Sequence, residues 1–88
     1  MIGGNQMLSI QRDGERAIID IRENIARGEH PKNHIFQFVQ EAPKGTIIEI
    51  HVPFRAEPLI AGLSSFGLNV TVTELAPDHF KLMALKLN

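Results

Sequence analysis

The chain has 88 residues, 43% of them apolar, which suits a single domain, residues 1–88, with one modest core. It contains no cysteine, so disulfides, thiolate nucleophiles and sulfur ligands to metals are excluded. Nine basic and ten acidic residues give a net charge of −1, and no run of Lys or Arg supplies the clustered cations that nucleic-acid binding needs.

The first predicted elements are two strands joined by a turn. Arg12-Asp13-Gly14 separates the segments 7–11 and 15–21, and an Asp-Gly pair between apolar runs is typical of a β-hairpin. Ala17–Ile21 is the clearer strand. We expect residues 1–16 to form an N-terminal hairpin arm, which would add a strand to the sheet, or to be partly disordered.

A polar loop over residues 22–30 leads to the first predicted helix, which begins between Pro31 and His34. Proline suits the first helical position because the backbone N–H that it lacks would have no partner there. Pro43 ends the helix. Its apolar residues recur at the spacing of one buried stripe: Ile35, Phe38, Val39 and Ala42.

The second half of the chain begins with the predicted strand Thr46–Val52, followed by a loop over residues 53–57. The second helix is predicted over about Pro58–Phe66, with its apolar stripe at Leu59, Leu63 and Phe66. Gly62 lies inside this helix, where glycine is unfavourable by about 1 kcal/mol relative to alanine. It indicates either close packing on the sheet or flexibility near the loop.

Two further strands, Asn69–Glu74 and His79–Leu87, complete the order βαβαββ. The predicted fold class is α+β, a two-layer α/β sandwich. We expect a mixed four-stranded sheet with both helices on one face, and an extra N-terminal strand if the hairpin arm forms.

One face of this sheet would remain uncovered, and it is not fully polar. Two interpretations stay open: the apolar residues are scattered or covered by the N-terminal hairpin, or the face forms a homodimer. The apolar residues predicted on this face are Ile18, Ile47, Met83 and Leu85.

The chain resembles the DUF2249 family, a group of small bacterial domains in the TusA/SirA-like superfamily. The order and spacing of short segments carry the resemblance over residues 18–87. These segments are Ile19-Asp20-Ile21-Arg22, Ala26-Arg27-Gly28-Glu29-His30-Pro31, Ala42-Pro43-Lys44-Gly45-Thr46, Val52-Pro53-Phe54, Glu57-Pro58-Leu59 and Ala76-Pro77-Asp78-His79-Phe80. The resemblance implies the TusA-like βαβαββ fold reached above.

TusA-like sulfur carriers place a cysteine and a proline at the start of the first helix. The corresponding residues here are Glu29-His30-Pro31, which keep the proline but offer no thiol. Because a persulfide requires sulfur on the side chain, the resemblance implies the fold and the position of a site, but not sulfur transfer.

Both loops that follow the parallel strands lie at the carboxyl edge of the sheet, where open α/β sheets usually bind ligands. Guanidinium groups and the starts of helices suit a small anion. Salt bridges with Glu23, Glu29 and Glu57 are the competing explanation, and Phe54 is either a plug of the core or a wall of the pocket. The predicted ligand-binding residues are Arg27, His30, His34, Phe54 and Arg55.

The histidines give a weaker indication of chemistry. His30 and His34 are four residues apart and, with His51 or His79, form a set that Zn²⁺ or Cu²⁺ would favour. However, His51 is predicted on the uncovered face, and His79 at the start of a strand with an exposed ring. We therefore predict no metal site and no cofactor. A general-base role for His30 or His34 is the enzymatic alternative, but no partner residue supports it.

The leading functional hypothesis is a non-catalytic binding or accessory domain. It would act through a protein partner or through self-association, in bacterial redox or respiratory metabolism. The alternative is a domain that binds a small anion or metabolite at the helix starts. No apolar run reaches about 18 residues, and the N-terminus lacks signal-peptide features, so we expect a cytoplasmic location without membrane contact.

Overall fold

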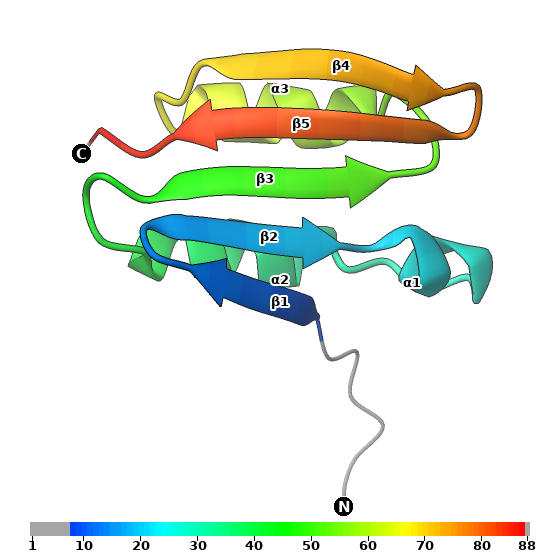
Figure 1. Ribbon diagram of the computed structural model, residues 1–88, viewed down its shortest axis with the longest axis horizontal. Helices are drawn as coiled ribbons and strands as arrows, with labels where there is room; N and C mark the ends of the chain where they lie inside the picture. The colour runs from blue at the N-terminus through cyan, green and yellow to red at the C-terminus, as the bar shows by residue number, and fades with distance from the viewer. Residues whose placement is uncertain (1–7, 88) are drawn as a thin grey trace, which may run out of the picture.

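The computed structural model describes residues 8–87, which form one five-stranded sheet and three helices (Figure 1). Part of the predicted N-terminal arm, residues 1–7, lies outside the described residues. In chain order the elements are β1 (Ser9–Asp13), β2 (Arg16–Asp20), α1 (Arg22–Ala26), α2 (Lys32–Glu41), β3 (Ile47–Val52), α3 (Glu57–Ser65), β4 (Val70–Ala76) and β5 (His79–Leu85).

The strands lie in the order β1-β2-β3-β5-β4. The pair β2–β3 is parallel, and the other three pairs are antiparallel, so the sheet is mixed as predicted. The prediction of four strands was one short, because residues 9–13 pair with β2 along their whole length. The hairpin loop is Gly14-Glu15, where Gly14 adopts a φ of 62° that glycine tolerates without steric penalty.

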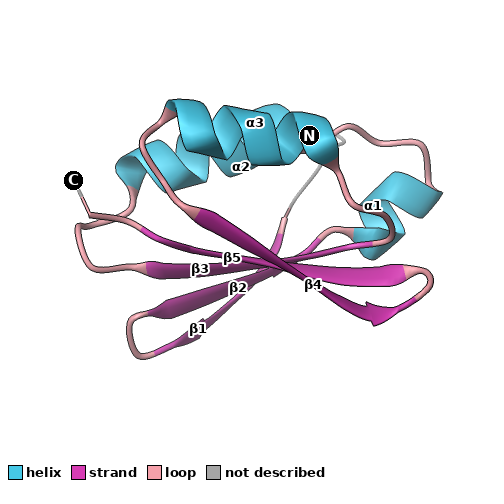
Figure 2. Ribbon diagram, turned by 90° about the horizontal axis from the view of Figure 1, so that it is seen from above, coloured by secondary structure: helices cyan, strands magenta, loops and turns pink. Residues whose placement is uncertain are grey.

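Helices α2 and α3 lie side by side on one face of the sheet, which confirms the predicted two-layer arrangement (Figure 2). The apolar stripes of both helices are buried against the strands, since Ile35, Val39, Leu59 and Leu63 are all at most 5% exposed. The sheet contributes the other half of this core, principally Ile19, Ile48, Ile50, Val52 and Leu82.

Gly62 allows the two helices to approach closely. A β-carbon at this position would lie 2.1 Å from the ring of Phe36, closer than real side chains come. The Phe36 ring meets Phe66 edge-on, with 5.4 Å between the ring centroids. Gly62 therefore serves close packing, as one of its two interpretations required, but against α2 rather than against the sheet.

The segment predicted as a polar loop, residues 22–30, contains the short helix α1. The prediction of a loop was wrong for residues 22–26, because five residues are too few to show a helical period in the sequence. Gly28, with a φ of 80°, turns the chain after this helix. Buried Asn24 donates a hydrogen bond of 2.8 Å to Glu29, which links the helix to the loop that follows.

The face of the sheet opposite α2 and α3, here called the open face, is covered by no helix of residues 8–87 (Figure 2). Strand β1 extends the edge of the sheet and does not fold over this face. Ile18, Ile47 and Met83 are half-buried on it, and Leu85 is 44% exposed. Between residues 8 and 87, no helix has the length and apolar character needed to cross a membrane.

Candidate functional site

A cavity of about 390 Å³ lies where the starts of α2 and α3 meet the carboxyl ends of β2 and β3. We call it the apolar cavity, because nine of its lining residues are apolar and only His30 and Lys32 carry polar side chains. Its lining consists of Ile21, Ile25, His30, Pro31, Lys32, Ile35, Val52, Phe54, Ala56, Pro58 and Leu59. The position agrees with the carboxyl-edge location that the sequence predicted.

Two of the five predicted ligand-binding residues, His30 and Phe54, line the apolar cavity. Phe54 is 49% exposed, so it forms a wall of the cavity rather than a plug of the core. His34 is exposed on α2 and is not part of the lining. The other two predicted residues, Arg27 and Arg55, also lie outside the lining.

Both arginines form ion pairs within their own loops, as the competing explanation required. Arg55 binds Glu57, and Arg27 binds Glu29 at 3.2 Å. The hydrogen bond from Arg27, together with one from Asn24, lowers the pKa of Glu29 below its ordinary value. Their guanidinium groups are therefore already engaged by carboxylates of the chain.

Ala56, in the lining of the apolar cavity, has a left-handed backbone conformation with φ 56° and ψ 53°. For a residue with a β-carbon this conformation is unfavourable by about 1–2 kcal/mol. Ala56 directly precedes α3 and is only 8% exposed. The chain thus keeps a strained residue at the point where the loop after β3 turns into the cavity wall.

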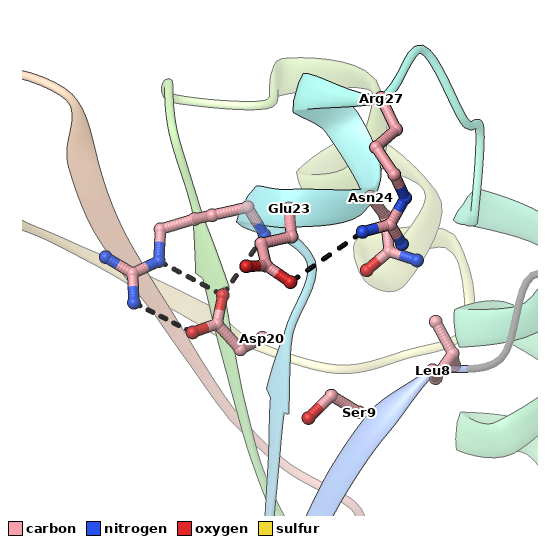
Figure 3. Close-up of a pocket in the computed structure, with 7 residues that line it drawn as sticks. Leu8, Ser9, Asp20, Glu23, Asn24 and Arg27 are labelled. Atoms are coloured by element: carbon pink, nitrogen blue, oxygen red, sulfur yellow. Dashed lines mark hydrogen bonds and ion pairs between the residues drawn. The ribbon is translucent and has the colours of Figure 1, made fainter.

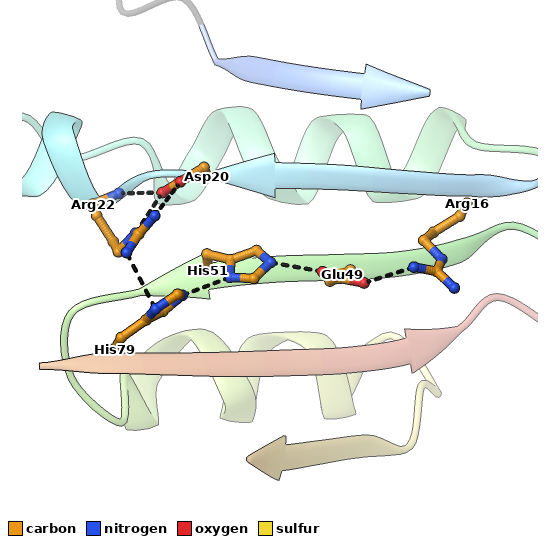
Figure 4. Close-up of polar contacts among 6 residues, drawn as sticks. All are labelled: Arg16, Asp20, Arg22, Glu49, His51 and His79. Atoms are coloured by element: carbon orange, nitrogen blue, oxygen red, sulfur yellow. Dashed lines mark hydrogen bonds and ion pairs between the residues drawn. The ribbon is translucent and has the colours of Figure 1, made fainter. Parts of the chain in front are cut away.

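A second group of functional side chains crosses the open face as a continuous series of polar contacts (Figure 4). We call it the polar chain; its members are Arg16, Asp20, Arg22, Glu49, His51 and His79. Glu49 is buried at 8% exposure, and its carboxylate accepts hydrogen bonds from Arg16 at 3.4 Å and His51 at 2.6 Å. The ring of His51 in turn contacts the ring of His79 at 2.7 Å.

Arg22 forms the other end of the polar chain. Its guanidinium group donates two hydrogen bonds to Asp20, at 3.0 and 2.8 Å, and lies 3.2 Å from Nδ1 of His79. The hydrogen bonds from Arg22 hold the pKa of Asp20 below its ordinary value, although partial burial acts in the opposite direction. Asp20 therefore fixes Arg22 in a position from which it reaches His79.

Two adjoining cavities border this part of the open face and share Ser9, Asp20 and Arg22. The smaller, about 200 Å³, is here called the polar cavity and is lined by Ser9, Gln11, Ile18, Asp20, Arg22, His51 and His79. The larger, about 520 Å³, extends along α1, where Arg27 approaches Glu23 to 3.7 Å (Figure 3).

Sequence reasoning missed the polar chain as a site. His79 was predicted to expose its ring, but that ring is half-buried between His51 and Arg22, so the prediction was wrong. One signal was visible, because Asp20, Glu49 and His51 all occupy positions of the open face in the strand alternation. The pairing of His51 with His79, 28 residues apart, depends on the strand order.

Within residues 8–87, no three histidine, aspartate or glutamate side chains gather as a metal site would require. Comparison of the chain with protein families, characterised proteins and solved structures finds no match.

Proposed function

We propose that the protein is a non-catalytic binding domain, and that the apolar cavity takes a small, mainly apolar molecule carrying one acidic group. The observation that carries this proposal is the cavity itself. About 390 Å³ of space at the carboxyl edge of parallel strands is lined almost entirely by apolar side chains. Of the two functions expected from the sequence, this favours the small-ligand alternative over a protein partner.

The acidic group is inferred from the rim of the apolar cavity. Lys32 and His30 supply its polar side chains, and Lys32 forms no ion pair with any residue of the described chain. No side chain caps the start of α2, so its first backbone N–H groups are free to bind an anion. An apolar body would fill the cavity while a carboxylate reached Lys32.

Titration of the ¹⁵N-labelled protein with octanoate, followed by amide chemical shifts, tests the proposal. We expect shifts at Ile21, Ala56 and Leu59, and weaker binding of octanamide, which matches octanoate in size but carries no charge. Lys32→Gln should weaken octanoate binding by about ten- to a hundredfold, since a charged hydrogen bond contributes about 1.5–3 kcal/mol. The control Lys44→Gln, on the turn before β3, should leave it unchanged.

Phe54→Glu gives a second, independent test. A carboxylate on this wall should repel octanoate with little effect on folding, because Phe54 is 49% exposed. Leu75→Glu is the matched control, since Leu75 is also 49% exposed but lies on β4. Octanoate binding that is equal in the two variants, or absent from the wild-type protein at millimolar concentration, would refute the proposal.

A second candidate function, contact with a protein partner or a second copy, is favoured by one observation. At the end of the open face next to Arg16, Ile47, Met83 and Leu85 border a shallow cavity of about 240 Å³. If this surface associates, sedimentation at rising concentration should reveal a dimer that Leu85→Lys disrupts. A protein that stays monomeric at all concentrations would rule out self-association.

The TusA-like family assignment, a bacterial redox or respiratory role and a cytoplasmic location remain predictions from the sequence.

A further inference from the structure

The polar chain plays no part in the proposed function, and it lies across the sheet from the apolar cavity. Its two imidazole rings stand between a carboxylate at one end and a guanidinium group at the other (Figure 4). Nε2 of His51 is 2.6 Å from Glu49, and Nδ1 of the same ring is 2.7 Å from Nε2 of His79. Nδ1 of His79 is 3.2 Å from Nη1 of Arg22. Each of the four ring nitrogens thus has one polar partner.

These partners admit a single arrangement of hydrogens. The ionised carboxylate of Glu49 only accepts, so Nε2 of His51 must carry a hydrogen. The guanidinium group of Arg22 only donates, so Nδ1 of His79 must be bare. The one remaining contact, between the rings, needs one hydrogen, which His79 donates from Nε2 to Nδ1 of His51. All contacts are satisfied when both histidines are neutral.

One additional proton from solvent has one place to go if the other contacts are kept. The contact with Glu49 holds one hydrogen and the contact between the rings holds another. The third hydrogen must therefore sit on Nδ1 of His79, where it faces the N–H of Arg22. The protonated pair then places two positively charged donors opposite each other with no acceptor between them.

We propose that the polar cavity is a proton-linked site for a small oxyanion, which bridges Nη1 of Arg22 and Nδ1 of His79 once the histidine pair has taken up one proton. Both residues line the cavity, whose volume of about 200 Å³ accommodates an ion of this class. An oxyanion would accept one charge-assisted hydrogen bond from each donor. In the neutral state Arg22 already donates to His79 and Asp20, so the same ion has no donor pair to bridge.

The charges within the polar chain agree with this linkage. Within the polar chain, the guanidinium groups of Arg16 and Arg22 balance the carboxylates of Asp20 and Glu49, so a proton on the histidines leaves one positive charge uncompensated. The neighbouring segments add one cation and two carboxylates, whose net charge of −1 works against an anion: Lys81 opposite His51 on β5, Asp78 near Arg22 in the turn before β5, and Asp13 opposite Arg16 on β1.

Sulfate is a suitable probe because its charge stays constant between pH 5 and 8, the range in which imidazole groups ordinarily titrate. Titrations of the ¹⁵N-labelled full chain, at constant ionic strength set with chloride, should show shifts at His79 and Arg22. Within the range where one proton is linked to binding, the sulfate affinity should rise about tenfold for each pH unit of acidification. The imidazole nitrogen spectrum at pH 7.5 should show His79 as the Nε2–H tautomer and His51 as the Nε2–H tautomer.

His79→Gln keeps a polar side chain but cannot take up a proton, so it should abolish the pH dependence of sulfate binding. His34→Gln is the matched control, since His34 is exposed on α2 and outside the polar cavity, and it should leave that dependence intact. Sulfate affinity that is equal at pH 5.5 and 7.5 in the wild-type protein overturns the proposal. An Nδ1–H tautomer of His79 at pH 7.5 does the same and requires no variant.

Discussion

The two faces of the sheet are built from alternate residues of the same strands, yet they are filled in opposite ways. In β3, Ile48 and Ile50 point toward the helices and are almost completely buried by apolar neighbours. Glu49 and His51 point to the open face, where hydrogen bonds to Arg16 and His79 satisfy them. One face is held by packing, and the other by polar pairing.

Burial alone does not distinguish the two faces. Glu49 is 8% exposed although no helix of residues 8–87 covers it, because neighbouring side chains on the sheet enclose it. A carboxylate in this position is tolerated only when its hydrogen-bonding capacity is filled. This end of the sheet can therefore stay uncovered by a helix because the polar chain fills the hydrogen-bonding capacity of its side chains. The polar chain also lies on the opposite face from the apolar cavity, so it can bind a ligand of its own.

The largest effect should come from the packed face. Leu63→Ala is expected to lower the free energy of unfolding by about 3 kcal/mol, because Leu63 is 0% exposed and its truncation leaves a cavity. Leu85→Ala on the open face, where Leu85 is 44% exposed, should lower it by less than about 1 kcal/mol. Urea unfolding followed by circular dichroism measures both. Similar losses in the two variants would contradict the distinction between the faces.

A change in the polar chain should be smaller but still clear. Glu49→Ala leaves His51 without its carboxylate and is expected to lower the free energy of unfolding by about 2 kcal/mol. The control Glu57→Ala removes a carboxylate from an exposed pair with Arg55, so its effect should stay within about 0.5 kcal/mol. If Glu49→Ala were as mild as the control, polar pairing would not be what stabilises the open face.

A substitution of Ala56, in the lining of the apolar cavity, should stabilise the protein, unlike the substitutions above. Ala56→Gly should raise the free energy of unfolding by about 1 kcal/mol, since glycine adopts the left-handed conformation without strain. Ala61→Gly, at an exposed position inside α3, should lower it by about 1 kcal/mol. Thermal unfolding of the two variants checks the prediction, and a loss of stability in both would show that Ala56 is unstrained.

The smallest expected effect depends on pH. Arg22 holds the pKa of Asp20 below the ordinary value of 3.8, so the pair stabilises the fold above that value and loses its contribution as the pH falls through the lower, folded-state pKa. Asp20→Asn should therefore be less stable than the wild-type protein by under about 1 kcal/mol at pH 7, because both side chains are about 40% exposed. The difference should shrink as the pH falls below 3.8 toward the lower, folded-state pKa of Asp20. If the difference in stability persists at low pH, it arises from packing and not from the ion pair.

Much of the fold could be predicted because its strands and its two longer helices carry clear periods. The stripe Ile35–Val39 and the alternation in Ile47–Val52 placed their elements to within one or two residues. Helix α1 could not be predicted, because its five residues show no period. Strand β1 was correctly suggested by the Asp13-Gly14 pair, although the loop lies one residue later.

The candidate site was harder, and for a physical reason. Two ion pairs could be predicted because their partners are neighbours in the sequence, and the structure forms both: Arg27 with Glu29, and Arg55 with Glu57. The contact of Arg22 with His79 joins residues 57 apart, which meet only because the strands bring them to one edge of the open face. Sequence spacing therefore predicted a ligand site at the strand ends, although one built from charged side chains, and it missed the polar chain on the other face of the sheet.

The most direct test of the account is a double titration of one ¹⁵N-labelled sample at pH 5.5, with octanoate first and sulfate second. We predict that octanoate shifts the amides of Ile21, Ala56 and Leu59, that sulfate shifts those of Arg22, His51 and His79, and that neither ligand displaces the other. Competition between them, or shifts of both ligands at the same residues, would contradict the central claim that the two faces of the sheet carry separate sites.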